Sequence, residues 1–420
     1  MRPEPKLPAD TRRRPMEHDI RQYRFLTYVM GGGVQTKEHE KLRDPVTPVR
    51  AASLRGQLRF WWRACNPSGC TTLEELRQRE AEVWGATSQA SQVMVDILKQ
   101  PGAPTFVQVY EYNNAGRIAP IRGMREIAYG AFPLQPDRDA QAAGKNPGVL
   151  FDYGTRPFEI RFSYPKALEA DVTAALRAWE TFGGLGARTR RGFGSVFRVN
   201  DGSSLDRVRS TLETFRLSRS IPGVPSLAGA RFEVARTTAS NPVEAWKQAL
   251  RVLQDLRQKV DLGRNPSQNG RPAGRSRWPE PDEIRRITKR SAGRHSRPVV
   301  TVERFPRARF GLPIVFHFEA GRDGDPDFKP LQIHPVGHDR FPSPLILRPL
   351  ADGDRYWPSA LALTVQMPDI ALTFGEETRN VEWRLNQALA SQIRVMNDRT
   401  PSGSRTFIDP IDRFLWELTK

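Results

Sequence analysis

Apolar and polar positions along this chain follow two different periods, which predicts a mixture of strands and helices. Residues 23–29 are rich in aromatic and β-branched side chains and predict a strand that ends at Gly31–Gly33. Past a polar loop, Ser53 is the expected N-cap of a helix. The apolar side chains of that helix recur at helical spacing: Leu54, Leu58, Trp61, Trp62 and Cys65.

Further elements follow in the first half. A second helix is expected to begin at Thr72, where Glu75 completes a capping box, and to end at Gly85. Two more strands, 91–99 and 158–164, flank a region interrupted by Gly and Pro that predicts an insertion with a hairpin near residues 101–147. An amphipathic helix and a last strand complete the series, at residues 168–179 and 193–199.

The order strand, helix, strand, strand, helix, strand predicts a ferredoxin-like βαββαβ unit, which is also the architecture of the RNA-recognition module. Strands and helices resume beyond a stretch rich in Ser, Pro and Gly. We therefore expect an α+β protein with tandem ferredoxin-like (RRM-like) domains, of which the second is less regular. The expected parts are a basic arm at 1–19, a first domain at 20–217, a linker at 218–227 and a second domain at 228–420.

The charge balance points to an anionic partner. The 420 residues include 65 Lys and Arg against 47 Asp and Glu, a formal net charge of +18. Charge of this size concerns partners such as nucleic acid or an anionic membrane rather than the fold. Residues 263–298 alone hold ten Lys or Arg and three acids, and their first half is expected to be a mobile basic loop. The chain has neither an apolar run long enough for a transmembrane helix nor a secretory signal, so a cytoplasmic protein is expected.

Metal and cofactor sites are not expected. Cys65 and Cys70 have no further zinc ligands nearby and predict a reduced pair. His334 and His338 lie in HPVGH, where Pro335 and Gly337 argue against a helix that would bring both to one face. No GxxxxGK[ST] motif is present, and the one partial GxGxxG follows a helix instead of a strand, so nucleotide-cofactor binding is not expected either.

The stretch FGGLGARTRRGFGS, residues 182–195, combines glycines with three closely spaced arginines. A tight connection between helix and strand explains one or two glycines by capping alone. It does not explain Arg188, Arg190 and Arg191, whose like charges repel and whose guanidiniums suit phosphate or carboxylate. Arg55, Arg59 and Arg63 form a second basic stripe, although any one of them also fits a solvated helix face.

These motifs carry a resemblance to a known family. PVRAASLRGQLRFWWRA, followed by a helix ending EAEVWGA and later by FGGLGARTRRGFGS, resembles the RAMP superfamily of CRISPR-associated proteins. More closely, the chain is similar to the first subunits of Cmr complexes, the type III-B RNA-guided effectors. GRSRWPEPDEIR, RFGLPIVFHFE and FPSPLILRPL are similar to the second half of that family, so the resemblance spans nearly the whole chain.

The resemblance implies tandem ferredoxin-like domains. It also implies that the chain is a non-catalytic, RNA-binding subunit of an antiviral ribonucleoprotein. The partners it implies are guide or target single-stranded RNA, near the guide 3′ end, and neighbouring RAMP subunits. It carries RNA contacts over to one set of loop residues and one set of helix residues: Gly183, Gly184, Gly186, Arg188, Arg190, Arg191 and Gly192 in the loop, and Arg50, Ser53, Arg55 and Arg59 in the helix.

Other functions stay open on the residues. Some RAMP proteins are metal-independent endoribonucleases, whose chemistry needs a general acid and base near a 2′-hydroxyl. Lys37, His39 and Lys41 are the candidates here, against the plainer interpretation of a solvated polar loop. Net charge does not separate RNA from DNA binding, and a purely assembling subunit with basic surfaces is a further alternative.

Overall fold

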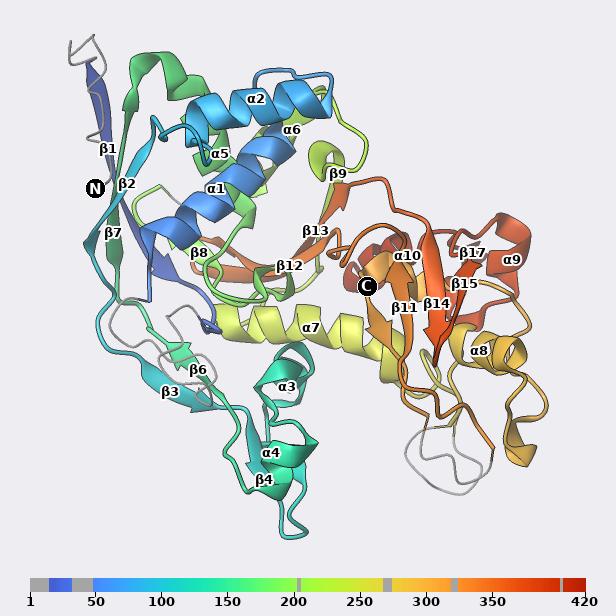
Figure 1. Ribbon diagram of the computed structural model, residues 1–420. Helices are drawn as coiled ribbons and strands as arrows, with labels where there is room; N and C mark the ends of the chain where they lie inside the picture. The colour runs from blue at the N-terminus through green and yellow to red at the C-terminus, as the bar shows by residue number, and fades with distance from the viewer. Residues whose placement is uncertain (1–14, 32–47, 202–204, 267–273, 319–323, 401–402) are drawn as a thin grey trace, which may run out of the picture.

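The computed structural model describes residues 15–31, 48–201, 205–266, 274–318, 324–400 and 403–420. Within these ranges no helix is long and apolar enough to cross a membrane. The class is mixed α+β with antiparallel sheets, as predicted, and Figure 1 shows how the elements are arranged.

The first sheet is antiparallel and four-stranded, in the order β2-β7-β1-β8. Its strands, in chain order, are β1 (Met16–Phe25), β2 (Met94–Lys99), β7 (Phe158–Pro165) and β8 (Val196–Arg198). Two long helices, α1 (Ala51–Cys65) and α5 (Glu169–Phe182), pack against each other over this sheet. The predicted βαββαβ order is therefore present here, with α2 (Leu73–Trp84) following α1 and α6 (Leu205–Phe215) following β8.

The second sheet has three strands in the order β12-β13-β9, and a fourth strand is not present in the described part of the chain. Its elements are β9 (Ser226–Val234), α7 (Pro242–Gln258), β12 (Leu345–Asp352) and β13 (Arg355–Thr364). A complete second ferredoxin-like unit thus remains a prediction.

β12 explains how the halves fit together. Its side chains alternate, because Ile346 and Leu350 join the core of α1 and α5 while Leu345 and Leu347 pack against α7. The second sheet therefore lies between two helical layers, and the apolar run LIL is the sequence of a strand buried on both faces. The order of layers is sheet, helices, sheet, helix.

The rest of the chain forms smaller units. A third sheet with its own apolar core has the order β10-β11-β14-β15, from Ile314–Val315, Leu331–Pro335, Ile370–Phe374 and Glu377–Val381. α8 (Glu280–Thr288) joins that core through Ile284. α9 (Gln387–Ser391) and α10 (Pro410–Leu418) add side chains to the apolar cluster of α7 instead, and the hairpin β16–β17 (Asn397–Thr400 and Gly403–Thr406) lies between them in the chain. Short 3-10 helices are η1 (Phe132–Leu134), η2 (Lys166–Leu168), η3 (Thr189–Arg191), η4 (Gly293–His295), η5 (Pro306–Phe310) and η6 (Arg394–Met396).

The region of residues 101–147, predicted to be an insertion, contains the predicted hairpin, β4–β5. It comprises β3 (Thr105–Gln108), β4 (Tyr110–Tyr112), β5 (Ile118–Pro120), α3 (Arg125–Gly130) and α4 (Arg138–Ala142), and β6 (Val149–Asp152) pairs with β3. In Figure 1 it extends below the first sheet, and α3 packs on α7 of the other half.

Several boundaries differ from the prediction. The first strand begins at Met16, so the expected arm of residues 1–19 overlaps β1, while 1–14 lie outside the described residues. α1 begins at Ala51 with Arg50 as N-cap and no side-chain cap, so Ser53 is inside the helix. The predicted N-cap of α2 is confirmed, since the Thr72 hydroxyl accepts a hydrogen bond from the Glu75 amide. Glu75 reaches back to the amide of Thr71 rather than to that of Thr72.

Candidate nucleic-acid interface

The loop from Phe182 to Ser195 is held in place by the segment that follows β1. The amide of Ala187 donates to the carbonyl of Met30 at 2.7 Å, and the amide of Gly194 donates to the carbonyl of Tyr28 at 2.9 Å. A further bond, from the Leu185 amide to the Gly194 carbonyl at 2.9 Å, closes the loop on itself. The protein's own backbone hydrogen bonds therefore define the shape of the loop.

The glycines of the loop serve this packing. Gly194 has φ 59°, and a Cβ there would lie 1.9 Å from the carbonyl oxygen of Leu185. Gly192 has φ 84° and faces the Trp246 ring, which a Cβ would approach to 2.6 Å. The predicted contacts Gly183, Gly184 and Gly192 are buried, and Gly186 is half-buried with φ 93°. Close approach by the protein's own backbone and side chains thus accounts for these glycines, and their predicted RNA contacts stay a prediction.

The three loop arginines differ from the glycines, because all are half-buried and none has a carboxylate partner among the described residues. Arg190 lies over the Phe60 ring, 5.1 Å from its centroid, and donates to the Ser343 carbonyl. Arg191 donates to the Phe310 carbonyl at 3.4 Å. Arg188 lies 5.2 Å from the centroid of Phe132. Their hydrogen-bond partners are neutral, so the charges are uncompensated.

Burial acts on these charges directly. It lowers the pKa of Arg190 to about 10, and burial together with neighbouring guanidiniums lowers the pKa of Arg191 to about 10. Burial likewise lowers the pKa of Arg188. Each shift means that the charged form is less favourable here than in water. An anion beside the loop would reverse that penalty.

The helix residues predicted to bind RNA are placed less favourably. α1 meets the loop through Phe60 and through Trp61, which lines a cavity of about 180 Å³ with Gly183 and Arg190. Arg59 is ion-paired with Glu80 of α2 at 2.6 Å, and Arg63 shares the same carboxylate at 2.5 Å. The basic stripe is thus partly neutralised inside the protein. Arg50 and Arg55 each have a buried Nε without a partner, and Ser53 is half-buried.

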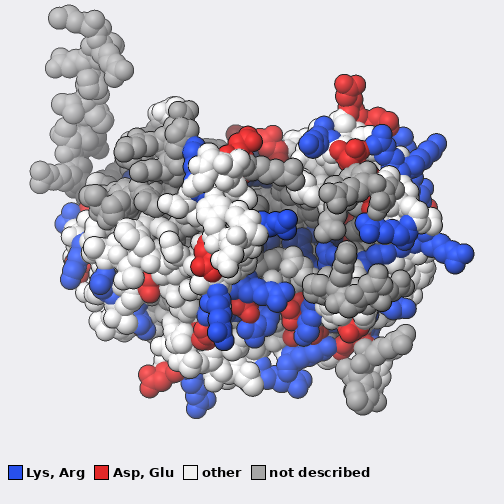
Figure 2. Space-filling model, turned by 90° about the horizontal axis from the view of Figure 1, so that it is seen from below, with Lys and Arg blue, Asp and Glu red and all other residues white. Residues whose placement is uncertain are grey.

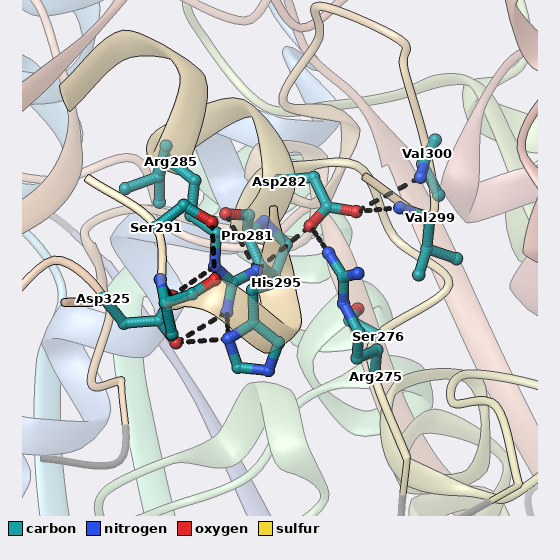
Figure 3. Close-up of polar contacts among 12 residues, drawn as sticks. Arg275, Ser276, Pro281, Asp282, Arg285, Ser291, His295, Val299, Val300 and Asp325 are labelled. Carbon is teal, nitrogen blue, oxygen red and sulfur yellow. Dashed lines mark hydrogen bonds and ion pairs between the residues drawn. The ribbon is translucent and has the colours of Figure 1, made fainter. Parts of the chain in front are cut away.

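The basic segment 263–298 is largely neutralised where the structure describes it. Figure 3 shows that Asp282 accepts hydrogen bonds from the amides of Val299 and Val300 and pairs with Arg275 and Arg285. Asp325 pairs with Arg285 at 2.8 Å and with His295 at 2.5 Å. The expected mobile loop is therefore held by ion pairs outside residues 267–273, which are not described.

The catalytic alternative falls outside the described residues, because Lys37, His39 and Lys41 all lie within 32–47. In the described part of the chain, no group of three His, Cys, Asp or Glu side chains could hold a metal ion. Cys65 and Cys70 are free and buried, and His334 bonds the Thr373 hydroxyl at 2.8 Å.

Residues 22–197 match the family model described as the RAMP superfamily. The matched segment belongs to that superfamily. The predicted RAMP resemblance is thereby confirmed over this segment, which contains α1, α5 and the arginine loop. No curated protein matches the chain.

Solved structures also resemble the chain. Apo Cmr1 from Pyrococcus furiosus has a TM-score of 0.46 and 18% identity, over 90% of this chain and 96% of that one. A chain of the type III-B Cmr-beta complex bound to cognate target RNA has a TM-score of 0.43 and 12% identity, over 90% of this chain and 98% of that one. TM-scores this low do not by themselves establish a shared fold.

Arg257, which lies beside the arginine loop of residues 182–195, was not identified from the sequence. Arg257 of α7 continues the spacing of Trp246, Leu250 and Leu253, which are buried, so a charge falls on the apolar face of the helix. That interruption of the apolar pattern is a signal that the sequence contains.

Proposed function

We propose that the chain is a non-catalytic RNA-binding subunit of a type III-B CRISPR RNA-guided antiviral effector complex. Its ligand is guide or target single-stranded RNA near the guide 3′ end, and its protein partners are neighbouring RAMP subunits. The RAMP match over residues 22–197 and the motifs shared with first subunits of Cmr complexes support this place.

The observation that carries the proposal is the set of uncompensated arginines. Arg188, Arg190 and Arg191 come from one short loop, are half-buried and have no carboxylate partner among the described residues. A buried donor left without a partner costs about 1–3 kcal/mol, and more when it is charged. Phosphate oxygens supply the missing acceptors, and phosphate contacts position a strand without reading its sequence.

The first test is the salt dependence of RNA binding. For single strands, log K changes with log[salt] by about −0.7 per phosphate neutralised. Replacing Arg188, Arg190 and Arg191 by alanine is expected to flatten that slope by about 2 if each meets one phosphate. The slope is measured with the full chain and an end-labelled oligouridine RNA by fluorescence anisotropy.

The control removes the same charge elsewhere. Arg209, Arg216 and Arg379 have side chains that are 75%, 61% and 54% exposed, and each pairs with a nearby acid. Their triple alanine variant should keep the wild-type slope. Equal slopes for the loop variant and wild type would overturn the assignment of the loop.

A denaturing gel of the same RNA, with and without Mg²⁺, tests the catalytic alternative. Intact RNA is expected in both lanes. RNA that is cut by wild type and left intact by His39→Ala would make the chain a nuclease.

A further inference from the structure

A second arginine lies beside the loop, on a different element. Arg257 of α7 donates from Nη1 to the Tyr129 hydroxyl of α3 at 3.1 Å and lies 5.8 Å from the centroid of the Phe310 ring. Arg191 donates to the carbonyl of the same Phe310. Three separate segments, the loop, α7 and the insertion, thus bring polar groups to one place.

Each of the three arginines here has a guanidinium nitrogen without a hydrogen-bond acceptor. Nε of Arg188, Nη1 of Arg191 and Nε of Arg257 are buried and have no hydrogen-bond partner. Buried donors are nearly always paired in folded proteins, so three such atoms from neighbouring guanidiniums call for a physical reason. An acceptor with several oxygens would pair them together.

Positive charge exceeds negative charge around these three arginines, which also favours an anionic ligand. Burial and the guanidiniums of Arg257, Arg188 and Arg190 act together to lower the pKa of Arg191. Against the effect of burial, Tyr129 and the charge of Glu280 raise the pKa of Arg257. Glu280 is wholly buried, however, and accepts hydrogen bonds from the amide and Nε of Arg307, at 2.6 and 3.0 Å. Glu280 is therefore committed to another arginine, which leaves the positive charge of the other guanidiniums in excess.

The insertion, which contributes Tyr129, extends below the first sheet in Figure 1. Figure 2 looks onto that side and shows Lys and Arg side chains gathered around a central hollow. Tyr129 and Phe132 of the insertion contact Arg257 and Arg188, so the insertion forms one wall. Tyr129 is half-buried, so this wall reaches the molecular surface.

We infer that Arg188, Arg191 and Arg257 form one phosphate site, with Tyr129 as the residue that orients Arg257, and that it holds a backbone phosphate of the bound RNA. The inference rests on the proposed function and extends it to α7 and to the insertion, which the loop motif does not include. Three guanidiniums without a carboxylate suit the oxygens of one phosphate group.

The test replaces Arg257 by methionine in the full chain. Loss of a charged contact to one phosphate should weaken oligouridine binding about tenfold. It should also flatten the salt slope, by at most about 0.7, because Arg188 and Arg191 still contact the same phosphate. The unfolding temperature without RNA is measured as well, because Arg257 donates to the Tyr129 hydroxyl and removal of that contact acts on stability. A merely structural arginine would lower the unfolding temperature and leave the salt slope unchanged, so the salt slope decides between the two roles.

Two further variants keep the test decisive. Arg257→Lys retains the charge and should retain the salt slope. Arg251→Met removes a charge from the same helix, where Arg251 pairs with Glu126 and its side chain is 54% exposed, and should bind RNA within about twofold of wild type. If the Arg257→Met variant binds oligouridine RNA with the same affinity as the Arg251→Met variant, the inference is overturned.

The outcomes separate the two proposals. If the loop triple variant loses RNA binding while Arg257→Met does not, the proposed function stands and the phosphate site fails. If neither variant changes RNA binding, the proposed function itself fails. If inorganic pyrophosphate raises the unfolding temperature of wild type but not of Arg257→Met, and RNA affinity is equal in both, the site takes another anion and the RNA assignment is wrong.

Discussion

Single residues in the arginine loop have separate tasks. The glycines allow the backbone to fold against Trp246, Leu185 and the segment after β1, and the arginines carry the charge. The sequence shows both residue types together but not that division, because a glycine needed for close packing and one needed for ligand approach look the same. Only the distances around each Cα separate them.

Gly194→Ala tests the task of the glycines. The new Cβ would lie 1.9 Å from a backbone oxygen at φ 59°, so we expect the free energy of unfolding to fall by about 2 kcal/mol or more. Gly56→Ala is the matched control, since Gly56 lies in α1 with nothing within 4 Å, and it should stabilise by about 0.5–1 kcal/mol. Urea denaturation of both variants measures the difference, and equal midpoints would contradict it.

At the scale of elements, patterning predicts most of the first half. Its strands, its long helices and the hairpin in the insertion follow from period and turn residues, as does the cap at Thr72. Helix α6 was missed although Leu205, Val208, Leu212 and Phe215 have helical spacing. The pairing of Arg59 with Glu80 had no sequence signal, because the two residues come from different helices and meet only in the packed fold.

The cluster that anchors α8 gives a prediction for acid stability. Hydrogen bonds and charge from Arg285, with the Ala292 amide and His295, hold the pKa of Asp325 well below its usual range against the opposing effect of burial. A carboxylate with a lowered pKa stabilises the fold above its unfolded pKa of about 4, and that stability is lost as the pH falls towards its folded pKa.

Asp325→Asn should therefore cost about 3 kcal/mol near neutral pH, and the difference from wild type should shrink as the pH drops below about 4. Asp327→Asn is the control, because Asp327 is 58% exposed and pairs with Arg290, which is 50% exposed. Unfolding followed by circular dichroism across pH measures both. A difference from wild type that stays constant from neutral to acid pH would rule out this role for Asp325.

For the whole molecule, the two predicted domains share a core. Side chains of α1 and α5 lie in one apolar cluster with Ile346, Leu350 and Leu361 of the second sheet. Local sequence patterns do not reveal such sharing, because each half alone shows complete amphipathic elements. The boundary at 218–227 stays a prediction, and the apolar core continues across it.

A fragment of residues 1–217 is expected to expose the face of α1 and α5 that the second sheet covers. It should aggregate or bind the dye ANS strongly, and co-expression with residues 218–420 should suppress both effects. Size-exclusion chromatography with ANS fluorescence makes the comparison. A soluble monomeric fragment that does not bind ANS would show that the first half folds independently.

The loop's own hydrogen bonds also bear on how fast a ligand is captured. Its backbone is closed by bonds to Met30 and Tyr28 of the same chain, so the ordering entropy of those residues is lost during folding rather than at encounter. Capture of an anionic strand would then be governed by diffusion and by the long-range attraction of a positively charged protein, without a slow step in which the loop forms.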